Sequence, residues 1–259
     1  MTIALIDADV LVYECSWRAQ ETIDWGDEQL TSTADLKAAK ADLDAAVADI
    51  MAAVGADRAI LALTDSDRAA NFRRGLLDSY KAHRETPGSH RPLAYRGLRA
   101  HVRATYEHRT TRGVEADDTL GILATVAQVK GLRLPPVEER VICSIDKDLM
   151  TVPGRHYNWR KPELGVREVT EEEADREHML HTLIGDRTDG YPGAPGIGKV
   201  RAERVLAVAS DQWWRAVVAS FKGDEEAALA NARCARILRA DDFDFATRLP
   251  ILWTPPKGD

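Results

Sequence analysis

At 259 residues the chain can bury a large core, and its length alone allows one large domain or a domain with an appended part. A composition of 44% hydrophobic and 30% charged residues, without a long polar low-complexity run, excludes a disordered protein. The net charge of -7 argues against a phosphate-rich partner, but residues 71–103 contain eight Lys and Arg against two acids. This distribution suits an enzyme whose acids hold metal and whose bases hold phosphates.

The amino-terminal apolar stretch is interrupted by Asp7 and Asp9, and neither a basic segment nor a small-residue cleavage site accompanies it. It predicts neither a signal peptide nor a membrane span, so we expect a cytoplasmic protein. The three cysteines, Cys15, Cys143 and Cys234, stand far apart and outside CxxC pairs. Their spacing argues against a disulfide framework and against a zinc site.

Strands and helices alternate along the first two thirds of the chain. Residues 2–10 predict a buried strand that ends near Asp7, and apolar residues at helical spacing predict a helix over about 35–54. The later elements expected are a strand at 58–64, a helix at 115–130 that stops at Gly131, a strand at 140–145 and a short strand at 155–159. The alternation predicts an α/β fold with a mostly parallel sheet flanked by helices.

The last third of the chain is helical by pattern. A helix is predicted at 171–184, the Gly/Pro-rich break YPGAPGIG follows, and Lys199 begins another helix, which together make a helix-hairpin-helix pattern. We therefore expect a catalytic core and a helical part. The expected bounds are 1–170 for the core, with a basic clamp at about 71–105, and 171–259 for the helical part, with the helix-hairpin-helix at about 184–206.

Acidic residues gather in five short motifs, several of which follow a predicted strand. Since the carboxyl ends of parallel strands meet at one edge of a sheet, we expect these carboxylates to converge there. Oxygen ligands without His or Cys suit Mg²⁺ or Mn²⁺, and two such ions would support hydrolysis of a phosphodiester. The candidate metal ligands are Asp7 in LIDAD, Asp65 in TDSD, Glu115, Asp117 and Asp118 in GVEADD, Asp146 and Asp148 in SIDKD, and Asp186 and Asp189 in GDRTD.

Each acidic motif alone has an ordinary structural explanation. An Asp after a strand is usually a turn or helix cap, and acids at the start of a helix favour its dipole. The coincidence of five such groups, several at strand ends of one sheet, is what favours a metal centre.

Basic residues supply candidate phosphate contacts. Lys81 and Arg84 in SYKAHR are three residues apart, so they share a face if the segment is helical and could hold a scissile phosphate; a solvated basic helix face is the alternative. The break PGAPGIG presents backbone amides without obstructing side chains, which favours a sequence-independent grip on DNA over a simple sharp turn. The candidate DNA contacts are Arg73, Arg74, Gly196, Gly198, Lys199 and Arg201.

The motifs GVEADD, SIDKDL, SYKAHR and GDRTDGYPGAPGIG resemble, in content and order, those of the 5′-nuclease superfamily, which includes flap endonucleases and the 5′-exonuclease domain of bacterial DNA polymerase I. The likeness is greatest to the 5′-to-3′ exonucleases of T7-like phages, through NFRR, IDKDLMTVP, GDRTDGY and ARILRADDFDF. The resemblance implies a PIN-like core, a helix-hairpin-helix (H3TH) that grips duplex DNA with K⁺ at the hairpin, attack from 5′ ends, and, for a phage-encoded protein, action in the host cytoplasm.

The resemblance also implies roles for individual residues. One metal ion would be held by Asp7, Asp65, Glu115 and Asp117, and a second mainly by Asp146, Asp148, Asp186 and Asp189, with Asp118 nearby. Lys81 and Arg84 would be the catalytic residues that engage the scissile phosphate. Three positions depart from the family pattern: Ala8 stands where many relatives have Gly, Gly190 replaces a common Asn, and Val200 stands in place of the usual Lys. The stretch between Lys81 and Glu115 is short, which favours an open clamp over an arch that threads single strands.

The sequence and the resemblance together predict a 5′-to-3′ exodeoxyribonuclease that uses two Mg²⁺ ions, with Mn²⁺ as a substitute. Its expected partner is DNA, as a duplex or a flap with a 5′ end; RNA–DNA hybrids and replication proteins are further candidate partners, and a membrane is not. A structure-selective flap endonuclease is the alternative within the same chemistry. A noncatalytic DNA-binding module is the alternative from another class, but a binding surface gains nothing from nine acids that face phosphate.

Overall fold

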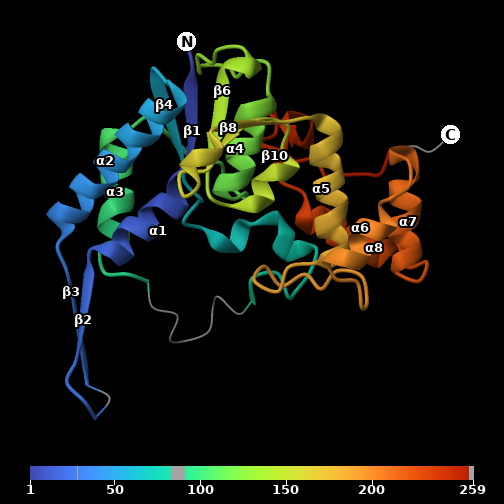
Figure 1. Ribbon diagram of the computed structural model, residues 1–259, viewed down its shortest axis with the longest axis horizontal. Helices are drawn as coiled ribbons and strands as arrows, with labels where there is room; N and C mark the ends of the chain where they lie inside the picture. Colours follow the sequence, from blue (N-terminus) through green and yellow to red (C-terminus); the bar gives the residue numbers. More distant parts are fainter. Residues whose placement is uncertain (28, 83–90, 257–259) are drawn as a thin grey trace.

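A six-stranded sheet forms the centre of the protein (Figure 1). The computed structural model describes residues 1–27, 29–82 and 91–256. The strands lie in the order β5-β4-β1-β6-β7-β8, and only the β7–β8 pair is antiparallel. Their bounds are β1 (Ile3–Asp7), β4 (Arg58–Ala62), β5 (His108–Arg109), β6 (Arg140–Cys143), β7 (Gly154–Tyr157) and β8 (Val166–Val169). The predicted mostly parallel sheet is therefore confirmed.

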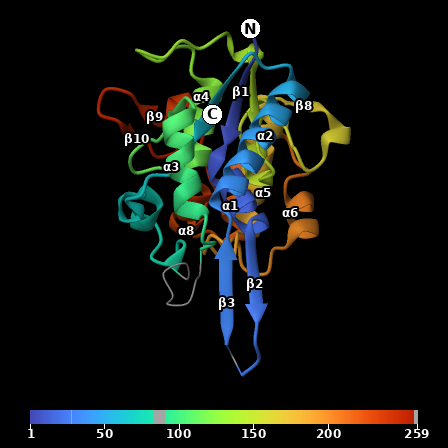
Figure 2. The same cartoon turned by 90° about the vertical axis from the view of Figure 1, so that its left-hand side faces the viewer.

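Helices cover both faces of this sheet, because alternate residues of the central strand point to opposite sides. Ala4 and Ile6 of β1 pack into one apolar cluster, and Ile3 and Leu5 pack into another. The first cluster is covered by α1 (Ala8–Arg18), α2 (Leu36–Val54) and α3 (Tyr95–Thr105), which face the viewer in Figure 2, and the second by α4 (Ala116–Thr125). Within the described residues, no helix has the length and apolarity that crossing a bilayer requires.

A two-stranded hairpin that the sequence analysis did not predict projects from the end of α1 (Figure 1). It consists of β2 (Gln20–Asp24) and β3 (Leu30–Ala34), paired antiparallel. Almost every residue of both strands is exposed. Because neither face of the hairpin is buried, its sequence lacks the apolar alternation that marks a strand.

The helical part has an apolar cluster of its own, to which α5, α6, α7 and α8 contribute. These helices span α5 (Glu171–Ile184), α6 (Lys199–Val205), α7 (Trp213–Ser220) and α8 (Glu225–Ala235). The predicted helix at 171–184 is confirmed, and a capping box between Thr170 and Glu173 begins it. After α8 the chain returns to the core, where β9 (Phe243–Asp244) and β10 (Leu249–Pro250) form a short hairpin.

Helix α4 ends at Thr125, so the prediction of a helix as far as residue 130 was wrong. The buried guanidinium of Arg140 donates to the backbone carbonyls of Leu123 and Val126 at 2.9 and 2.5 Å. These are carbonyls that a longer helix would have used for its own hydrogen bonds. A side chain 15 residues downstream of the helix end thus caps α4. The sequence near Thr125 therefore does not predict where this helix ends.

Gly121 lets the returning chain approach α4 closely. A Cβ at this position would overlap the carbonyl oxygen of Leu238. Ala normally stabilises a helix interior by about 1 kcal/mol relative to Gly. We expect Gly121→Ala to lower the free energy of unfolding instead, by about 1–3 kcal/mol, because of this overlap. Urea unfolding measures the change, and Gly75→Ala is the control since a Cβ there meets nothing within 4 Å; an unchanged or raised stability of Gly121→Ala would contradict the close packing.

Candidate active site

The carboxyl ends of β4, β1 and β6 lie side by side at one edge of the sheet. Asp7 is the last residue of β1, and its Oδ1 accepts a hydrogen bond from the backbone N–H of Val10 at 3.2 Å. Its Oδ2 accepts from the hydroxyl of Ser144 at 2.8 Å, and that hydroxyl accepts from the backbone N–H of Asp146 at 3.0 Å. Ser144 thus joins the end of β1 to the loop that follows β6.

Two helices bring further acids to the same region. Glu115 is the N-cap of α4, and Asp117 lies in its first turn. The tight loop after α5 carries Asp186 and Asp189, and Oδ1 of Asp186 accepts from the backbone N–H groups of Thr188 and Asp189 at 2.6 and 3.1 Å. The tertiary fold therefore draws acids from four separate segments of the chain.

A first group of acids interacts around α4. Burial raises the pKa of Asp117 well above its ordinary value, and the charges of Asp7, Asp146 and Glu115 raise it further. Burial, followed by the charges of Asp9 and Asp146, also raises the pKa of Asp7. Since like charges raise a carboxyl pKa only at short range, these acids lie close together.

A second group of acids interacts beside the first. Burial raises the pKa of Asp148 to about 7, and the charges of Asp146, Asp186 and Asp189 add to this shift, against a smaller opposing effect of Lys147. The charge of Asp146 therefore acts on members of both groups. These two groups contain seven of the nine predicted metal ligands, namely Asp7, Glu115, Asp117, Asp146, Asp148, Asp186 and Asp189.

— 

The donor set fits a hard divalent cation. Every acid of the two groups offers only carboxylate oxygens, the ligands that Mg²⁺ and Mn²⁺ prefer. Burial and then neighbouring carboxylates raise the pKa of Asp7, Asp117 and Asp148, and a divalent cation would relieve the repulsive part of these shifts. Among residues 1–27, 29–82 and 91–256, no three His, Cys, Asp or Glu side chains already form a cage around one point. The carboxylates are within electrostatic range but not at coordination geometry.

The raised pKa of Asp148 predicts a pH dependence of stability. Between about pH 4 and its folded pKa of about 7, this carboxyl keeps a proton that the unfolded chain releases. As pH rises through this window, Asp148 therefore lowers the free energy of unfolding by a growing amount, which stays constant above about pH 7. With chelator present, we expect Asp148→Asn to be more stable than the wild type at pH 8 and equally stable at pH 4. Urea unfolding of both proteins from pH 4 to 8 tests this, and a difference that shrinks as pH rises would contradict it.

Lys81 lies among the acids. Its Nζ is 2.6 Å from Oε1 of Glu115 and 3.3 Å from Oδ2 of Asp189. Burial raises the pKa of Glu115, but the charges of Lys81 and Arg73 and the hydrogen bonds from Lys81 and Tyr80 outweigh burial and lower this pKa to about 2. Lys81 has a φ of 52°, so it is not part of a right-handed helix. It therefore does not present the helical face that it was expected to share with Arg84. Arg84 lies outside the described residues.

Asp118 and Arg73 were assigned wrongly, because both are buried and paired with each other. Their exposed fractions are 0% and 1%, and two hydrogen bonds of 2.6 and 2.7 Å join the guanidinium to the carboxylate. The Asp118 oxygens also accept from the backbone N–H groups of Glu115 and Leu238 at 3.0 and 3.1 Å. Asp118 is thus a structural carboxylate rather than a metal ligand, and Arg73 has no surface with which to touch DNA.

Asp65 lies three residues beyond β4, at the expected edge of the sheet. Its Oδ1 accepts from the backbone N–H of Asp67 at 3.3 Å and from the hydroxyl of Ser66 at 3.4 Å, so its hydrogen bonds are local to the turn. Its role as a metal ligand stays a prediction.

Asp9 is a residue of the site that sequence reasoning missed. Its carboxylate accepts from the backbone N–H of Thr64 at 2.9 Å and pairs with Arg99 of α3, so it braces the loop after β4. The second Asp of LIDAD was the available signal. Residues two apart point away from each other on a helix, and only the fold shows that Asp9 turns toward β4 and α3.

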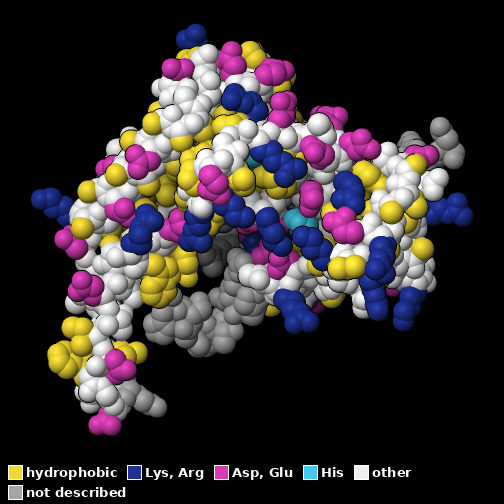
Figure 3. All heavy atoms as spheres, in the orientation of Figure 1, with side chains coloured by type: hydrophobic (Ala, Val, Ile, Leu, Met, Phe, Trp, Pro, Cys, Tyr) yellow, Lys and Arg dark blue, Asp and Glu magenta, His cyan; other side chains and the backbone are white. Residues whose placement is uncertain are grey.

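Most of the remaining candidate DNA contacts are at the surface. Gly196, Gly198, Lys199 and Arg201 are exposed at the start of α6, and the guanidinium of Arg201 donates to the carbonyl of Gly196 at 2.8 Å. Arg74 is half-buried. In Figure 3, Lys and Arg side chains form a band across the middle of the face shown and continue over the helical part. These contacts stay predictions.

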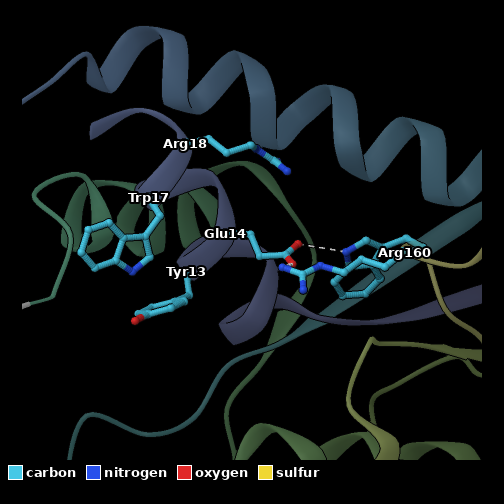
Figure 4. Close-up of a pocket in the computed structure, with 6 residues that line it drawn as sticks. Tyr13, Glu14, Trp17, Arg18 and Arg160 are labelled. Carbon is cyan, nitrogen blue, oxygen red and sulfur yellow. Dashed lines mark hydrogen bonds and ion pairs between the residues drawn. The ribbon is translucent and has the colours of Figure 1, made fainter. Parts of the chain in front are cut away.

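A pocket of about 420 Å³ lies beside α1, and none of the acids of the two groups lines it (Figure 4). The residues that line it are Tyr13, Glu14, Trp17, Arg18, Trp159 and Arg160. Arg160 forms an ion pair with Glu14, and Arg18 forms one with Asp42 at 2.9 Å, so both guanidinium groups are already neutralised. The acids, by contrast, gather at the sheet edge, which is where we place the chemistry.

A parallel sheet whose carboxyl edge gathers acids around a lysine, beside a helical part with an exposed basic turn, is an arrangement that suits a nuclease. Residues 2–181 match the family described as "5'-3' exonuclease, N-terminal resolvase-like domain". The match covers more than half of the chain, and the protein belongs to this family of 5′–3′ exonucleases.

Relatives extend the match over nearly the whole chain. The exodeoxyribonuclease of Enterobacteria phage T3 and the exonuclease of Escherichia phage T7 are each 27% identical to it, over 98% of the chain and 93% of the relative. The solved structure of the T5 D15 protein co-crystallised with metal ions superposes with a TM-score of 0.60 at 16% identity, covering 90% of this chain and 88% of the other. That structural likeness shows the shared fold.

Proposed function

We propose that this 5′–3′ exonuclease hydrolyses duplex DNA from 5′ ends with two divalent metal ions. The observation that carries the proposal is the pair of repelling carboxylate groups that share Asp146 at the sheet edge. The phage T3 relative is named an exodeoxyribonuclease, and one similar T5 structure is described as a complex with DNA and metal ions.

The proposed metal is Mg²⁺, with Mn²⁺ as a substitute. The ligands of the first ion would be Asp7, Asp65, Glu115 and Asp117, and those of the second mainly Asp146, Asp148, Asp186 and Asp189. Two such ions would lower the pKa of a bound water and stabilise the attacking and leaving oxygens of an in-line displacement. Without cations, the same acids would repel the phosphate that they must approach.

The other residues would bind and orient the DNA. Lys81, with Arg84, would hold the scissile phosphate, and Arg74 would contact the backbone nearby. The turn before α6 would contact phosphates of the duplex without reading bases, through Gly196, Gly198, Lys199 and Arg201. K⁺ would bind at the same turn, between α5 and α6. RNA–DNA hybrids are further proposed substrates, replication proteins are proposed partners, and the cytoplasm is the proposed compartment.

A duplex labelled separately at its 5′ and 3′ ends tests the proposal. Incubation with the full-length protein in Mg²⁺ or Mn²⁺ should release the 5′ label first, as very short products, and chelator should stop the release. Early release of the 3′ label would overturn the direction of attack. Binding without cleavage in either metal would favour a noncatalytic DNA clamp.

A structure-selective flap endonuclease is the second candidate, because one similar T5 structure is described as a flap endonuclease. Matched substrates that differ only in a 5′ flap separate the two activities. Cleavage at the base of the flap, faster than at a blunt 5′ end, would favour the endonuclease. Stepwise loss from the 5′ end of both substrates would favour the exonuclease.

A further inference from the structure

The ammonium of Lys81 fully engages a carboxylate that the proposed metal site needs. Its Nζ lies 2.6 and 2.7 Å from the two oxygens of Glu115 and 3.3 Å from Oδ2 of Asp189. The phenol of Tyr80 donates to the same Glu115 at 2.8 Å. Both oxygens of Glu115 are thus occupied by donors of the protein itself.

The backbone of Lys81 is fixed, so only its side chain can leave this position. Its N–H donates to the carbonyl of Asp189 at 2.7 Å. A Cβ at Gly190 would overlap the carbonyl oxygen of Ser79, so the two loops are in direct contact and glycine is required there. The lysine side chain is 12% exposed, and its ammonium group is carried on a flexible four-carbon stem. Departure from Glu115 therefore needs a change of rotamer rather than a loop movement.

We infer that Lys81 is an internal counter-cation for Glu115 and Asp189, and that it leaves Glu115 when a divalent cation takes that carboxylate. A divalent cation on Glu115 would compete for the oxygen lone pairs that now accept from the ammonium, and two cations on one carboxylate repel each other. The ammonium released in this way can then contact the DNA phosphate, and this last step rests on the proposed function. Metal binding and placement of the lysine are thereby linked.

Thermodynamic linkage between metal binding and the Lys81 contact determines in which direction the metal affinity changes when Lys81 is removed. If Lys81 competes with the metal, its removal must strengthen metal binding, although a lysine beside a substrate site would usually be expected to support activity. We expect Lys81→Met to bind Mn²⁺ about tenfold more tightly than the wild type, within the usual range of such couplings. Lys81→Arg keeps the charge and should bind Mn²⁺ as the wild type does.

The experiment is a titration of the full-length protein with Mn²⁺ alone, without DNA, followed by calorimetry or by the paramagnetic signal of free Mn²⁺. Lys147→Met is the matched control, because this lysine is also near the acids, at 3.9 Å from Asp148, but its side chain is 78% exposed. Tighter binding by Lys81→Met alone supports competition. Equal gains in both variants, or no gain, would overturn it, since general removal of positive charge would then explain the result.

A second measurement on the wild type does not depend on any variant. Acetylation of Lys81 by acetic anhydride, which transfers an acetyl group to the amine and releases acetate, should become several-fold faster on addition of Mn²⁺, as followed by mass spectrometry, while acetylation of Lys147 should change little. An unchanged rate at Lys81 would overturn the exchange. The proposed function can fail separately: if the end-labelled duplex is not cut, yet Mn²⁺ releases Lys81, the exchange stands and the nuclease activity does not.

Discussion

Asp146→Asn is expected to reduce turnover by at least about a thousandfold, equivalent to several kcal/mol of lost transition-state stabilisation. Asp146 acts electrostatically on both carboxylate groups, so its neutralisation should weaken both proposed metal sites at once. The fold should persist, because Asn can still accept the hydrogen bond from the backbone N–H of Asp148 that the carboxylate accepts at 2.9 Å. Release of 5′ label in Mg²⁺, with circular dichroism of the same sample, measures both effects.

The matched control for this substitution is Asp211→Asn, which removes one exposed carboxylate in the helical part. It should leave turnover within about twofold, since exposed charges far from the site are screened by salt. Loss of repulsion should also make Asp146→Asn as stable as the wild type, or more stable, in chelator. Near-normal cleavage by a folded Asp146→Asn variant would contradict a catalytic role of the two carboxylate groups.

Arg73→Met is expected to destabilise the protein by about 3–5 kcal/mol, the usual cost when one partner of a buried ion pair is removed. Asp118 is fully buried and would lose both of its hydrogen bonds from the guanidinium. Arg73 also donates to the backbone carbonyls of Cys234 and Arg236 at 3.1 and 2.5 Å, so it ties the chain after α8 to the start of α4. Urea unfolding at neutral pH measures the loss.

A double-mutant cycle separates the pair from its surroundings. Arg73→Met combined with Asp118→Leu should cost at least about 2 kcal/mol less than the sum of the two single changes, because the uncompensated charge is then gone. The same cycle at Arg18 and Asp42, a surface pair with side chains 54% and 44% exposed, should give a coupling of about 1 kcal/mol or less. Equal couplings for the two pairs would show that burial of Arg73 and Asp118 has no such energetic consequence.

The sequence predicted the sheet because its strands and helices carry local signals. The apolar runs of β1, β4 and β6 and the periodic helices α2 and α5 lie where their patterns indicated. The hairpin of β2 and β3 escaped prediction because neither of its faces is buried. The end of α4 escaped it because Arg140 caps the helix from a distant strand.

The residue types along the chain indicate the chemistry of the site: acids with oxygen ligands alone, placed after strands, in a motif order that also indicates the family. Which of the two neighbouring acids in EADD faces the site follows from the packing of distant segments and not from the local sequence. Asp117 joins the repelling carboxylates, whereas Asp118 turns inward to Arg73. The physical reason is that consecutive helical residues point about 100° apart, and which direction is solvent or core depends on segments far away in the chain.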